Sequence, residues 1–539
     1  MDFDLIVIGG GINGCGILRD AAMRGLKCLL VEKNDFGSET TAASSQMIHG
    51  GARYLFSDRK TTHLSSVDSG YIQRIAPHLL FRIPFIVPVL KKEKWPLWGH
   101  HFYMELMETF FENYDHFTVL KNGLTHTRMD AAGALAVEPD LTENIIGAVG
   151  FDEWGIDTNR LCLGNIISAE QAGAQARNHT EVTRILKENG RVLGIRTRDL
   201  ITGEENEYRG KLTVNSTGPW ADRLAQMAGC RVPLRPSKGV HVAFDRRLSN
   251  YAVLAKAIDG RSIFLMPYQN ISFIGTTDDD YFGDPGDIPI LEDEVQYLLE
   301  GISHVFPSIR QARMTQAWAG VRPTLYQRGS NEEDLSRHHK VFDHELIEGT
   351  AGFLSIAGGK LAAYRMMSED LVDVAMKKLG KKGECRTHLV PLPGGERKVQ
   401  PQDLAKQFDI PTMAAQRLIY RYGVRAYEVL ELTREKSSFR NIVCSCDPVT
   451  EAELRFAVRH EGARTLEDLK RRTRATVGPC QGMGCFLGAA QVLGEELGLK
   501  PKQIWEQVDR SREKRWRDTV PVLSGVGLQQ EELTAQLYK

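Results

Sequence analysis

The first 32 residues contain the pattern that most restricts the fold of this chain. Leu5-Ile6-Val7-Ile8 is an uninterrupted apolar run, as expected of a strand buried on both faces. It leads into glycines at 9, 11 and 14, spaced G-x-G-x-x-G, and a helix over 17–24, a strand over 28–31 and Glu32 follow. Such glycines let backbone N–H groups approach a pyrophosphate, and an acid about 20 residues on can bind a ribose. This order predicts a Rossmann-like dinucleotide-binding domain; the alternative is a purely structural glycine turn.

Length and charge describe a globular protein of several domains. With 539 residues, 42% of them hydrophobic, the chain is too long for one core, and we expect two to four domains. A formal net charge of −1 gives no global field that would attract nucleic acid. The N-terminus enters a strand at once, leaving no room for a signal peptide, and no run of about 20 apolar residues is present. We therefore expect a cytoplasmic protein with reduced or metal-bound cysteines.

Four of the nine cysteines form two tight pairs near the C-terminus. Cys444 and Cys446 are spaced C-x-C, and Cys480 and Cys485 are spaced C-x4-C after a gap of 33 residues. Four soft thiolates suit an iron–sulfur cluster or a zinc ion. We favour the cluster, with zinc and unmetallated thiols as alternatives. The remaining cysteines are scattered singly and are interpreted as small buried residues: Cys15, Cys28, Cys162, Cys230 and Cys385.

Further motifs narrow the dinucleotide to FAD. After IVIGGGINGCG the chain contains ASSQMIHGGARYL, NSTGPWAD, FIGTTDDDY, AGVRPT and GGKLAAYR, in this order, within residues 1–390. Through these motifs the sequence resembles the FAD-dependent glycerol-3-phosphate dehydrogenases of the D-amino-acid-oxidase-like flavoprotein superfamily. The resemblance implies an α/β fold in which an antiparallel β-sheet substrate domain, the cap domain, covers a Rossmann-like FAD domain. A mostly helical C-terminal region follows.

The resemblance also implies a division of the chain. The FAD domain would be discontinuous, over 1–85, 150–235 and 335–385, and the cap domain would be inserted into it, over 86–149 and 236–334. A linker with a helical segment would follow over 386–440. The [2Fe–2S] module would span 441–490, and a helical tail would span 491–539.

By the same resemblance, a set of residues would contact FAD, with Val182 meeting the adenine through its backbone. They are Gly9, Gly11, Ile12, Asn13, Gly14, Glu32, Lys33, Thr41, Ser44, Ser45, Met47, Ile48, Val182, Thr217, Gly218, Gly359, Lys360 and Leu361.

The implied reaction oxidises sn-glycerol 3-phosphate to dihydroxyacetone phosphate. It needs a base for the hydroxyl proton, and we choose His49, because imidazole titrates near neutrality and this histidine would lie beside the flavin. It also needs cations for the phosphate. The candidates carried over from the family are Arg53, Arg322, Arg337 and Lys360, with Tyr54 as a hydroxyl contact. A surface role for Arg337 and an ion pair for Arg53 are the alternatives.

The C-terminal cysteines resemble the bacterioferritin-associated-ferredoxin-like [2Fe–2S] module. The chain matches C-x-C-x2-V-T and T-R-x-x-x-G-x-C-Q-G-x-x-C, but Ala475 or Thr476 replaces a customary glycine. We expect electrons to leave the flavin through the cluster toward partner subunits or a quinone, in an oligomer. The cations of 470–474 would offset the cluster's negative charge.

A segment over 85–117 has two interpretations. Lys91, Lys92 and Lys94 lie beside Trp95 and Trp98, and a helical run follows with one aromatic face: Tyr103, Met107, Phe110 and Tyr114. This pattern fits either peripheral docking on the cytoplasmic membrane or a partner, or packing inside the cap domain.

Three other functions remain open. The chain could oxidise an amino acid or a 2-hydroxy acid, it could be a glycerol-3-phosphate oxidase that uses oxygen, or it could be an electron-transfer or assembly subunit without a substrate site.

Overall fold

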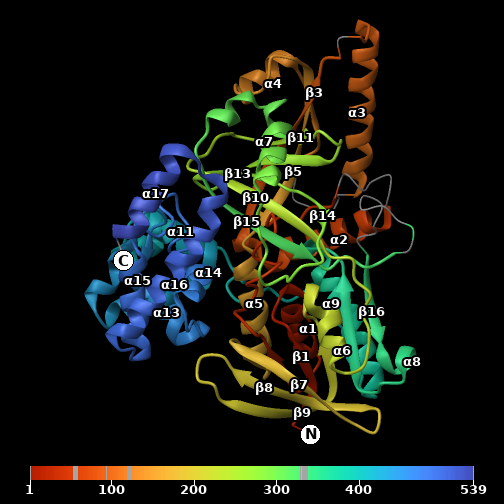
Figure 1. The fold of residues 1–539 in the computed structure, drawn as a ribbon, viewed down its shortest axis with the longest axis vertical. Helices are drawn as coiled ribbons and strands as arrows, with labels where there is room; N and C mark the ends of the chain where they lie inside the picture. The colour runs from red at the N-terminus through yellow and green to blue at the C-terminus, as the bar shows by residue number, and fades with distance from the viewer. Residues whose placement is uncertain are drawn as a thin grey trace.

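The structure is a computed structural model in which residues 2–51, 59–92, 94–117, 124–327, 329 and 338–537 are described. Figure 1 shows two sheets, one above the other along the long axis, with a helical C-terminal domain against one side of them. The arrangement confirms the predicted α/β architecture with a helical C-terminal region.

The lower sheet in Figure 1 is centred on β1 (Phe3–Ile8), whose residues are all buried. β1 pairs in parallel with β2 (Cys28–Val31) and with β9 (Glu205–Asn215). Its order is β16-β17-β9-β1-β2-β6, and the hairpin of β7 and β8 joins it through β9. The remaining strands are β6 (Gln175–Arg177), β7 (Thr180–Glu188), β8 (Arg191–Asp199), β16 (His339–Asp343) and β17 (Phe353–Gly358).

Alternate residues of β1 face opposite sides of this sheet, as strand geometry requires. Leu5 and Val7 pack in one hydrophobic cluster with helices of one layer, whereas Ile6 and Ile8 pack in another with the β7–β8 hairpin and α6. The helices around the sheet are α1 (Ile12–Met23), α2 (Arg59–Ile75), α5 (Thr158–Gln171), α6 (Ala221–Gln226), α8 (His344–Glu348) and α9 (Tyr364–Lys378).

The upper sheet is mostly antiparallel and has the order β14-β10-β13-β12-β11-β3-β5-β4, with β15 on the other edge of β10. Its strands are β3 (Leu80–Leu90), β4 (Thr127–Asp130), β5 (Ile145–Ile156), β10 (Ser237–Phe244), β11 (Ala252–Lys256), β12 (Ser262–Tyr268), β13 (Ile271–Gly275), β14 (Asp279–Asp280) and β15 (Met314–Arg322). Helices α3 (Leu97–Phe117), α4 (Ala131–Val137) and α7 (Glu292–Ser303) belong to this region. The predicted domain boundaries stay a prediction.

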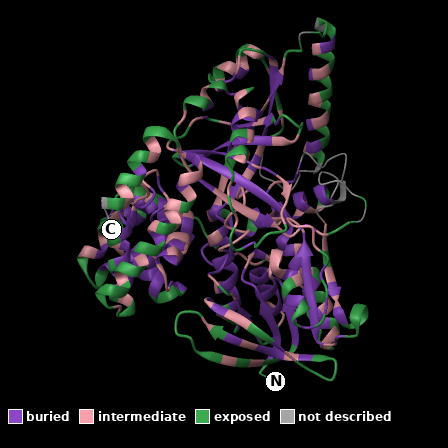
Figure 2. Cartoon of the chain, viewed as in Figure 1, coloured by how far each residue is buried: buried purple, intermediate pink, exposed green. Residues whose placement is uncertain are grey.

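Helix α3 stands at the edge of the upper sheet and extends beyond it (Figure 2). The predicted aromatic face packs on the sheet: Tyr114 is 1% exposed, and Tyr103, Met107 and Phe110 lie against the same hydrophobic cluster. The opposite face is not covered, because Trp98, Phe102 and Leu106 are 74%, 65% and 53% exposed.

The C-terminal domain is helical except for the short hairpin of β18 (Ile442–Cys444) and β19 (Val449–Thr450). Thr450 caps α13 by accepting the N–H of Glu453 at 3.2 Å. In the described residues, no helix combines the length and apolarity needed to cross a membrane. The helices are α10 (Pro401–Phe408), α11 (Thr412–Tyr422), α12 (Ala426–Glu431), α13 (Glu451–Glu461), α14 (Leu466–Thr473), α15 (Phe486–Leu497), α16 (Pro501–Thr519) and α17 (Gly525–Leu537).

Candidate functional site

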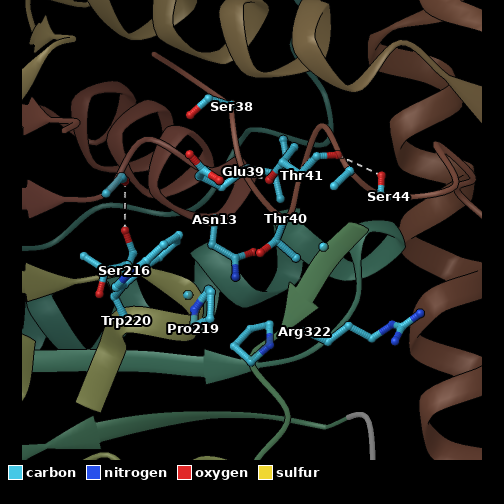
Figure 3. Close-up of a pocket in the computed structure, with 18 of the residues that line it drawn as sticks. Asn13, Ser38, Glu39, Thr40, Thr41, Ser44, Ser216, Pro219, Trp220 and Arg322 are labelled. Atoms are coloured by element: carbon cyan, nitrogen blue, oxygen red, sulfur yellow. Dashed lines mark hydrogen bonds between the residues drawn. The ribbon is translucent and has the colours of Figure 1, made fainter. Parts of the chain in front are cut away.

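A cavity of about 740 Å³ lies where the carboxyl ends of β1 and β2 meet the upper sheet. Its wall is formed by the turns after β1, β9 and β17, by the stretch that follows β2, and by the end of β15. Figure 3 shows Ser216 and Trp220 on one side of it and Arg322 on the other, with Asn13 and Thr40 between them. Ligands of open α/β sheets bind outside the carboxyl ends of the strands, so this cavity is the candidate site.

The glycine turn leaves backbone N–H groups open to the cavity. Gly9 has a φ of +103°, and a Cβ on Gly14 would lie 1.8 Å from the carbonyl oxygen of Gly9, so neither position accepts a side chain without a shift. A Cβ on Gly11 would meet only Thr41 Oγ1, at 3.5 Å, so this glycine borders open space. Helix α1 has no side-chain cap and no acid in its first turn. The positive end of its dipole therefore faces the cavity and favours an anion such as a diphosphate.

Glu32 ends β2 with its carboxylate against the glycine turn. One oxygen accepts the N–H of Gly10 at 2.6 Å, and the other accepts the N–H of Asn34 at 2.8 Å. Burial raises the pKa of Glu32, although these two N–H groups act in the opposite direction. Each oxygen keeps a lone pair, so the carboxylate can still accept a ribose hydroxyl.

Hydroxyl groups line the stretch after β2. Thr41 Oγ1 accepts the N–H of Ile12 at 3.2 Å, and Ser44 Oγ donates to the carbonyl oxygen of Thr41 at 2.8 Å. The buried Ser38 Oγ has no hydrogen-bond partner among the described residues. Buried polar groups are normally paired, so an orphaned hydroxyl in a cavity wall fits a site that a polar ligand completes.

Most residues predicted to contact FAD do line the cavity: Gly9, Gly11, Ile12, Asn13, Glu32, Lys33, Thr41, Ser44, Ser45, Met47, Val182, Thr217, Gly218, Gly359, Lys360 and Leu361. Gly14 and Ile48 are not in the wall. Gly14 instead allows α1 to pack on β1, and the fully buried Ile48 donates its N–H to Trp154 at 2.9 Å. The predicted site residues Arg53, Tyr54 and Arg337 lie outside the described residues.

His49 lines the cavity on the segment between β2 and α2, and both of its neighbours are held in place. Ser69 Oγ donates to the carbonyl oxygen of Ile48 at 2.5 Å. A Cβ on Gly50 would lie 2.3 Å from Ser66 Oγ and 2.6 Å from the hydroxyl of Tyr114, so α2 and α3 pack directly on this glycine. The backbone that presents His49 is therefore fixed by its surroundings.

His241 on β10 is a second histidine of the cavity wall, and the sequence analysis did not identify it. Its Nε2 lies 2.9 Å from Ser45 Oγ, its ring stacks on Trp318, and its Nδ1 has no hydrogen-bond partner in the described part of the chain. Burial, with Arg322 nearby, lowers the pKa of His241 to about 3. The imidazole is therefore neutral at physiological pH, and its protonation is unfavourable.

Two predicted cations, Arg322 and Lys360, lie in the cavity wall. Arg322 Nη1 donates to Asp278 Oδ1 at 3.0 Å, and Nη2 donates to Thr276 Oγ1 at 3.0 Å. These bonds orient a guanidinium that is only 25% exposed. Lys360 follows the positive-φ glycine Gly359 at the end of β17.

The four C-terminal thiols lie together as two pairs. Cys444 lies next to Cys485, and Cys446 lies next to Cys480. The Cys485 thiol, together with backbone N–H groups, lowers the pKa of Cys444 to about 6 despite its burial. No three of the four sulfurs, all of which belong to the described residues, lie within 4.8 Å of one another.

The loop that carries the second pair has an unusual backbone. Thr476 has a φ of +75°, which identifies it as the position where a glycine is customary. Its N–H lies close to the sulfurs of Cys444 and Cys485 and lowers the pKa of both thiols.

The neighbouring arginines do not all serve the cysteine loop. Arg471 and Arg472 bind Asp35, which follows β2, at 2.8 and 2.5 Å. Their charge is neutralised there, so the prediction that they offset a metal centre is wrong.

Comparison with known proteins places the chain in a family. Residues 4–365 match the model of the FAD dependent oxidoreductase family, and residues 385–504 match the C-terminal domain of alpha-glycerophosphate oxidase. The chain is 30% identical to a subunit of the anaerobic glycerol-3-phosphate dehydrogenase of Haemophilus influenzae, over 99% of this chain and 92% of that one. The corresponding subunit from Escherichia coli K12 is also 30% identical, over 99% and 96% of the two chains.

Among solved structures, the chain is similar to the glycerol-3-phosphate dehydrogenase from Bacillus halodurans complexed with FAD. The TM-score is 0.77 at 25% identity, covering 97% of this chain and 96% of that one. The glycine cradle and the cavity agree with these matches. The chain belongs to the FAD-dependent oxidoreductases and, within them, to the glycerol-3-phosphate dehydrogenase family.

Proposed function

We propose that this chain oxidises sn-glycerol 3-phosphate to dihydroxyacetone phosphate with a bound FAD. The observation that carries the proposal is one continuous cavity, in which a dinucleotide cradle meets His49, Arg322 and Lys360. A cradle alone would fit any dinucleotide enzyme, and cations alone would fit any anion site. Their combination fits the oxidation of a phosphorylated alcohol, and relatives over the full length carry the corresponding name.

Each part of the cavity has a role in this reaction. When bound, FAD supplies the acceptor for the hydride. The N-terminus of α1 and Glu32 would hold its diphosphate and ribose. Arg322 and Lys360 would grip the phosphate of the substrate, and this remote binding energy would position the reacting carbon. His49 would take the proton of the hydroxyl group.

An anaerobic titration tests the proposal. The purified protein should contain FAD, and sn-glycerol 3-phosphate should bleach it in the absence of air, whereas an amino acid or a 2-hydroxy acid should not. If the flavin bleaches only with an amino acid or a 2-hydroxy acid, the protein oxidises that class of compound instead. Peroxide release during aerobic turnover would identify an oxidase, and no bleaching with any of them would indicate a protein without a substrate site.

We also propose that the four cysteines hold a [2Fe–2S] cluster, which passes electrons on to partner subunits or a quinone. In such a cluster each iron takes two of the four thiolates, so two separate sulfur pairs are expected. A zinc ion would draw all four sulfurs into one tetrahedron with edges of about 3.8 Å. The pairing of Cys444 with Cys485 and of Cys446 with Cys480 therefore favours the cluster. Stoichiometric zinc and no EPR signal after reduction would contradict it.

Replacing Arg322 with glutamine should weaken substrate binding. We expect kcat/KM for glycerol 3-phosphate to fall by about 10- to 100-fold, mostly through a higher KM, because charge-assisted hydrogen bonds to the phosphate are lost. Arg261 provides the matched control: it donates to Asp279 of β14 at 3.0 Å, next to Asp278, but does not line the cavity. Steady-state kinetics of Arg322→Gln and Arg261→Gln should therefore differ, and equal losses would remove the phosphate role of Arg322.

We further propose that α3 contacts the membrane surface. Its uncovered face presents Trp98, Phe102 and Leu106, and the exposed Lys91 and Lys92 precede it. The acids that would repel anionic lipid are partly neutralised, because Arg128 binds Glu105 at 2.6 Å and Glu108 at 2.7 Å. Aromatic residues beside lysines are typical of interfacial anchors.

Liposome flotation checks this contact. The wild-type protein should float with anionic vesicles, and Trp98→Ser combined with Phe102→Ser should abolish flotation without changing flavin reduction. Substitution of Ile258, which is 70% exposed on another part of the cap, should have no effect. A wild-type protein that never floats would contradict membrane contact.

A further inference from the structure

We infer that Tyr268 is the junction through which electrons pass from the FAD cavity to the four-cysteine site. The inference rests on the proposed function, because it requires both FAD and a [2Fe–2S] cluster. Two routes of contacts lead from the cavity wall to Tyr268, and one route continues from Tyr268 to the cysteine loop.

The first route from the cavity wall to Tyr268 is a hydrogen bond. Gln46 lines the cavity between Ser45 and Met47, and its Oε1 accepts the hydroxyl of Tyr268 at 2.9 Å. Tyr268 is the last residue of β12 and is 4% exposed. The phenol therefore reaches the cavity wall without water between them.

The second route from the cavity wall to Tyr268 consists of aromatic rings in contact. His241 in the cavity wall stacks on Trp318 with their centroids 5.1 Å apart. Trp318 contacts Phe273 at 5.4 Å, and Phe273 contacts Tyr268 at 6.3 Å. These rings come from β10, β15, β13 and β12, which lie side by side in the upper sheet.

From Tyr268 the path continues into the C-terminal domain through Arg474. Arg474 Nη1 donates to the Tyr268 hydroxyl at 3.1 Å, and its guanidinium carbon lies 5.0 Å from the centre of the ring. Arg474 Nε donates to Asp447 Oδ2 at 3.1 Å. Asp447 is the neighbour of Cys446 in the chain. The path from Gln46 to a cysteine ligand thus runs through bonds and hydrogen bonds.

Other buried contacts between the domains give longer routes. The pair of Asp35 with Arg472 joins a helix of the C-terminal domain. The pair of Asp157 with Arg421 reaches Asp447 only through Glu453 and Arg417, and the step from Arg421 to Glu453 spans 3.9 Å. Asn270 does reach the carbonyl oxygen of Cys446, at 3.4 Å, but this contact is exposed to solvent. Among the described residues, Tyr268 is the point where buried contacts from the cavity converge toward the cysteines.

Electrons pass from the flavin to the cluster one at a time, and each step balances. Substrate oxidation leaves two electrons on the flavin. Each transfer removes one of them and reduces one ferric ion of the cluster to the ferrous state. A quinone or partner protein reoxidises the cluster between transfers, and after the second transfer the flavin is oxidised and its proton is released to water.

The test uses the full-length holoenzyme with measured FAD and iron contents. Tyr268→Leu removes the ring and the hydroxyl, and Arg474→Gln interrupts the path on the cysteine side. After anaerobic mixing with glycerol 3-phosphate, absorbance follows flavin bleaching and freeze-quench EPR follows cluster reduction. We expect both variants to bleach at about the wild-type rate and to reduce the cluster at least about tenfold more slowly.

A control separates electron transfer from packing. Phe81 packs on the ring of Tyr268, with the ring centroids 5.1 Å apart, but lies on neither route, so Phe81→Leu should leave cluster reduction unchanged. The EPR spectrum and reduction potential of the cluster, measured by chemical titration without substrate, should be unchanged in Tyr268→Leu. The inference is wrong if Tyr268→Leu matches Phe81→Leu, or if a shifted potential accounts for the slower rate. If the wild-type flavin does not bleach, or if the protein lacks iron, it is the proposed function that fails, and the inference fails with it.

Discussion

Replacing His49 with alanine is expected to slow the reduction of the flavin by glycerol 3-phosphate by about 10²–10⁴-fold, the usual contribution of a general base. FAD should stay bound, because His49 is separate from the glycine turn and from Glu32, which would hold the other end of the dinucleotide. Single-turnover bleaching under anaerobic conditions, with the FAD content measured first, gives this rate directly.

His241 provides the decisive comparison, because it is the other histidine of the cavity wall among the described residues. His241→Gln can keep the hydrogen bond to Ser45 but cannot act as a base. If His49 is the base, this variant should lose much less activity than His49→Ala. The opposite order, with His49→Ala close to wild type, would transfer the role to His241. Because the pKa of His241 is about 3, its protonation cannot explain a loss of rate between pH 5 and 8.

Local patterns in the sequence predicted the local structure well. The glycine spacing specified the turn between β1 and α1 because a side chain at Gly14 would collide with the backbone of Gly9. The start of α13 likewise has a local cause, because the hydroxyl of Thr450 caps the helix. The turn at Asn189-Gly190, where both residues have positive φ, closes the hairpin of β7 and β8. In each case the cause lies within a few residues of the element.

Long-range partners were the part that the sequence did not reveal. His241 sits in a strand without a motif, and only the packing of β10 against the stretch after β2 brings it to Ser45. Arg471 and Arg472 lie close to the cysteines in the sequence, which suggested a role at a metal centre. Their actual partner, Asp35, is more than 400 residues away, and no local pattern marks that pairing.

Asp35→Asn is expected to destabilise the attachment of the C-terminal domain by about 3–5 kcal/mol, because it leaves the buried guanidinium group of Arg472 without its carboxylate partner. Arg471 would keep Asp468, at 2.8 Å, as its second partner. Asp35 is fully buried and binds Arg472 at 2.5 Å and 2.9 Å and Arg471 at 2.8 Å. An asparagine would keep the shape but present an amide and no charge. Differential scanning calorimetry should show the C-terminal domain unfolding at a clearly lower temperature.

Asp199→Asn is the matched control, since Asp199 also joins the FAD domain to the C-terminal domain, through Arg464 at 2.8 Å, but both side chains are more than 20% exposed. Ion pairs at that exposure contribute about 1 kcal/mol or less, so this variant should unfold almost like wild type. Equal effects of the two substitutions would contradict a special role for the buried cluster.

The same cluster predicts how docking depends on pH. Burial alone would raise the pKa of Asp35, but the guanidinium groups of Arg472 and Arg471 outweigh it and hold the pKa well below its usual range. A carboxyl group with a depressed pKa stabilises the folded state fully above its unfolded value of about 3.9 and loses this contribution only as the pH falls further. The wild-type domains should therefore stay docked throughout pH 5–8. Asp35→Asn should be destabilised by a similar amount across that range, because it has no carboxylate to titrate.

Since Asp35 follows Glu32 by three residues, the variant should also bind FAD less tightly, which equilibrium titration of the apoprotein with FAD would measure.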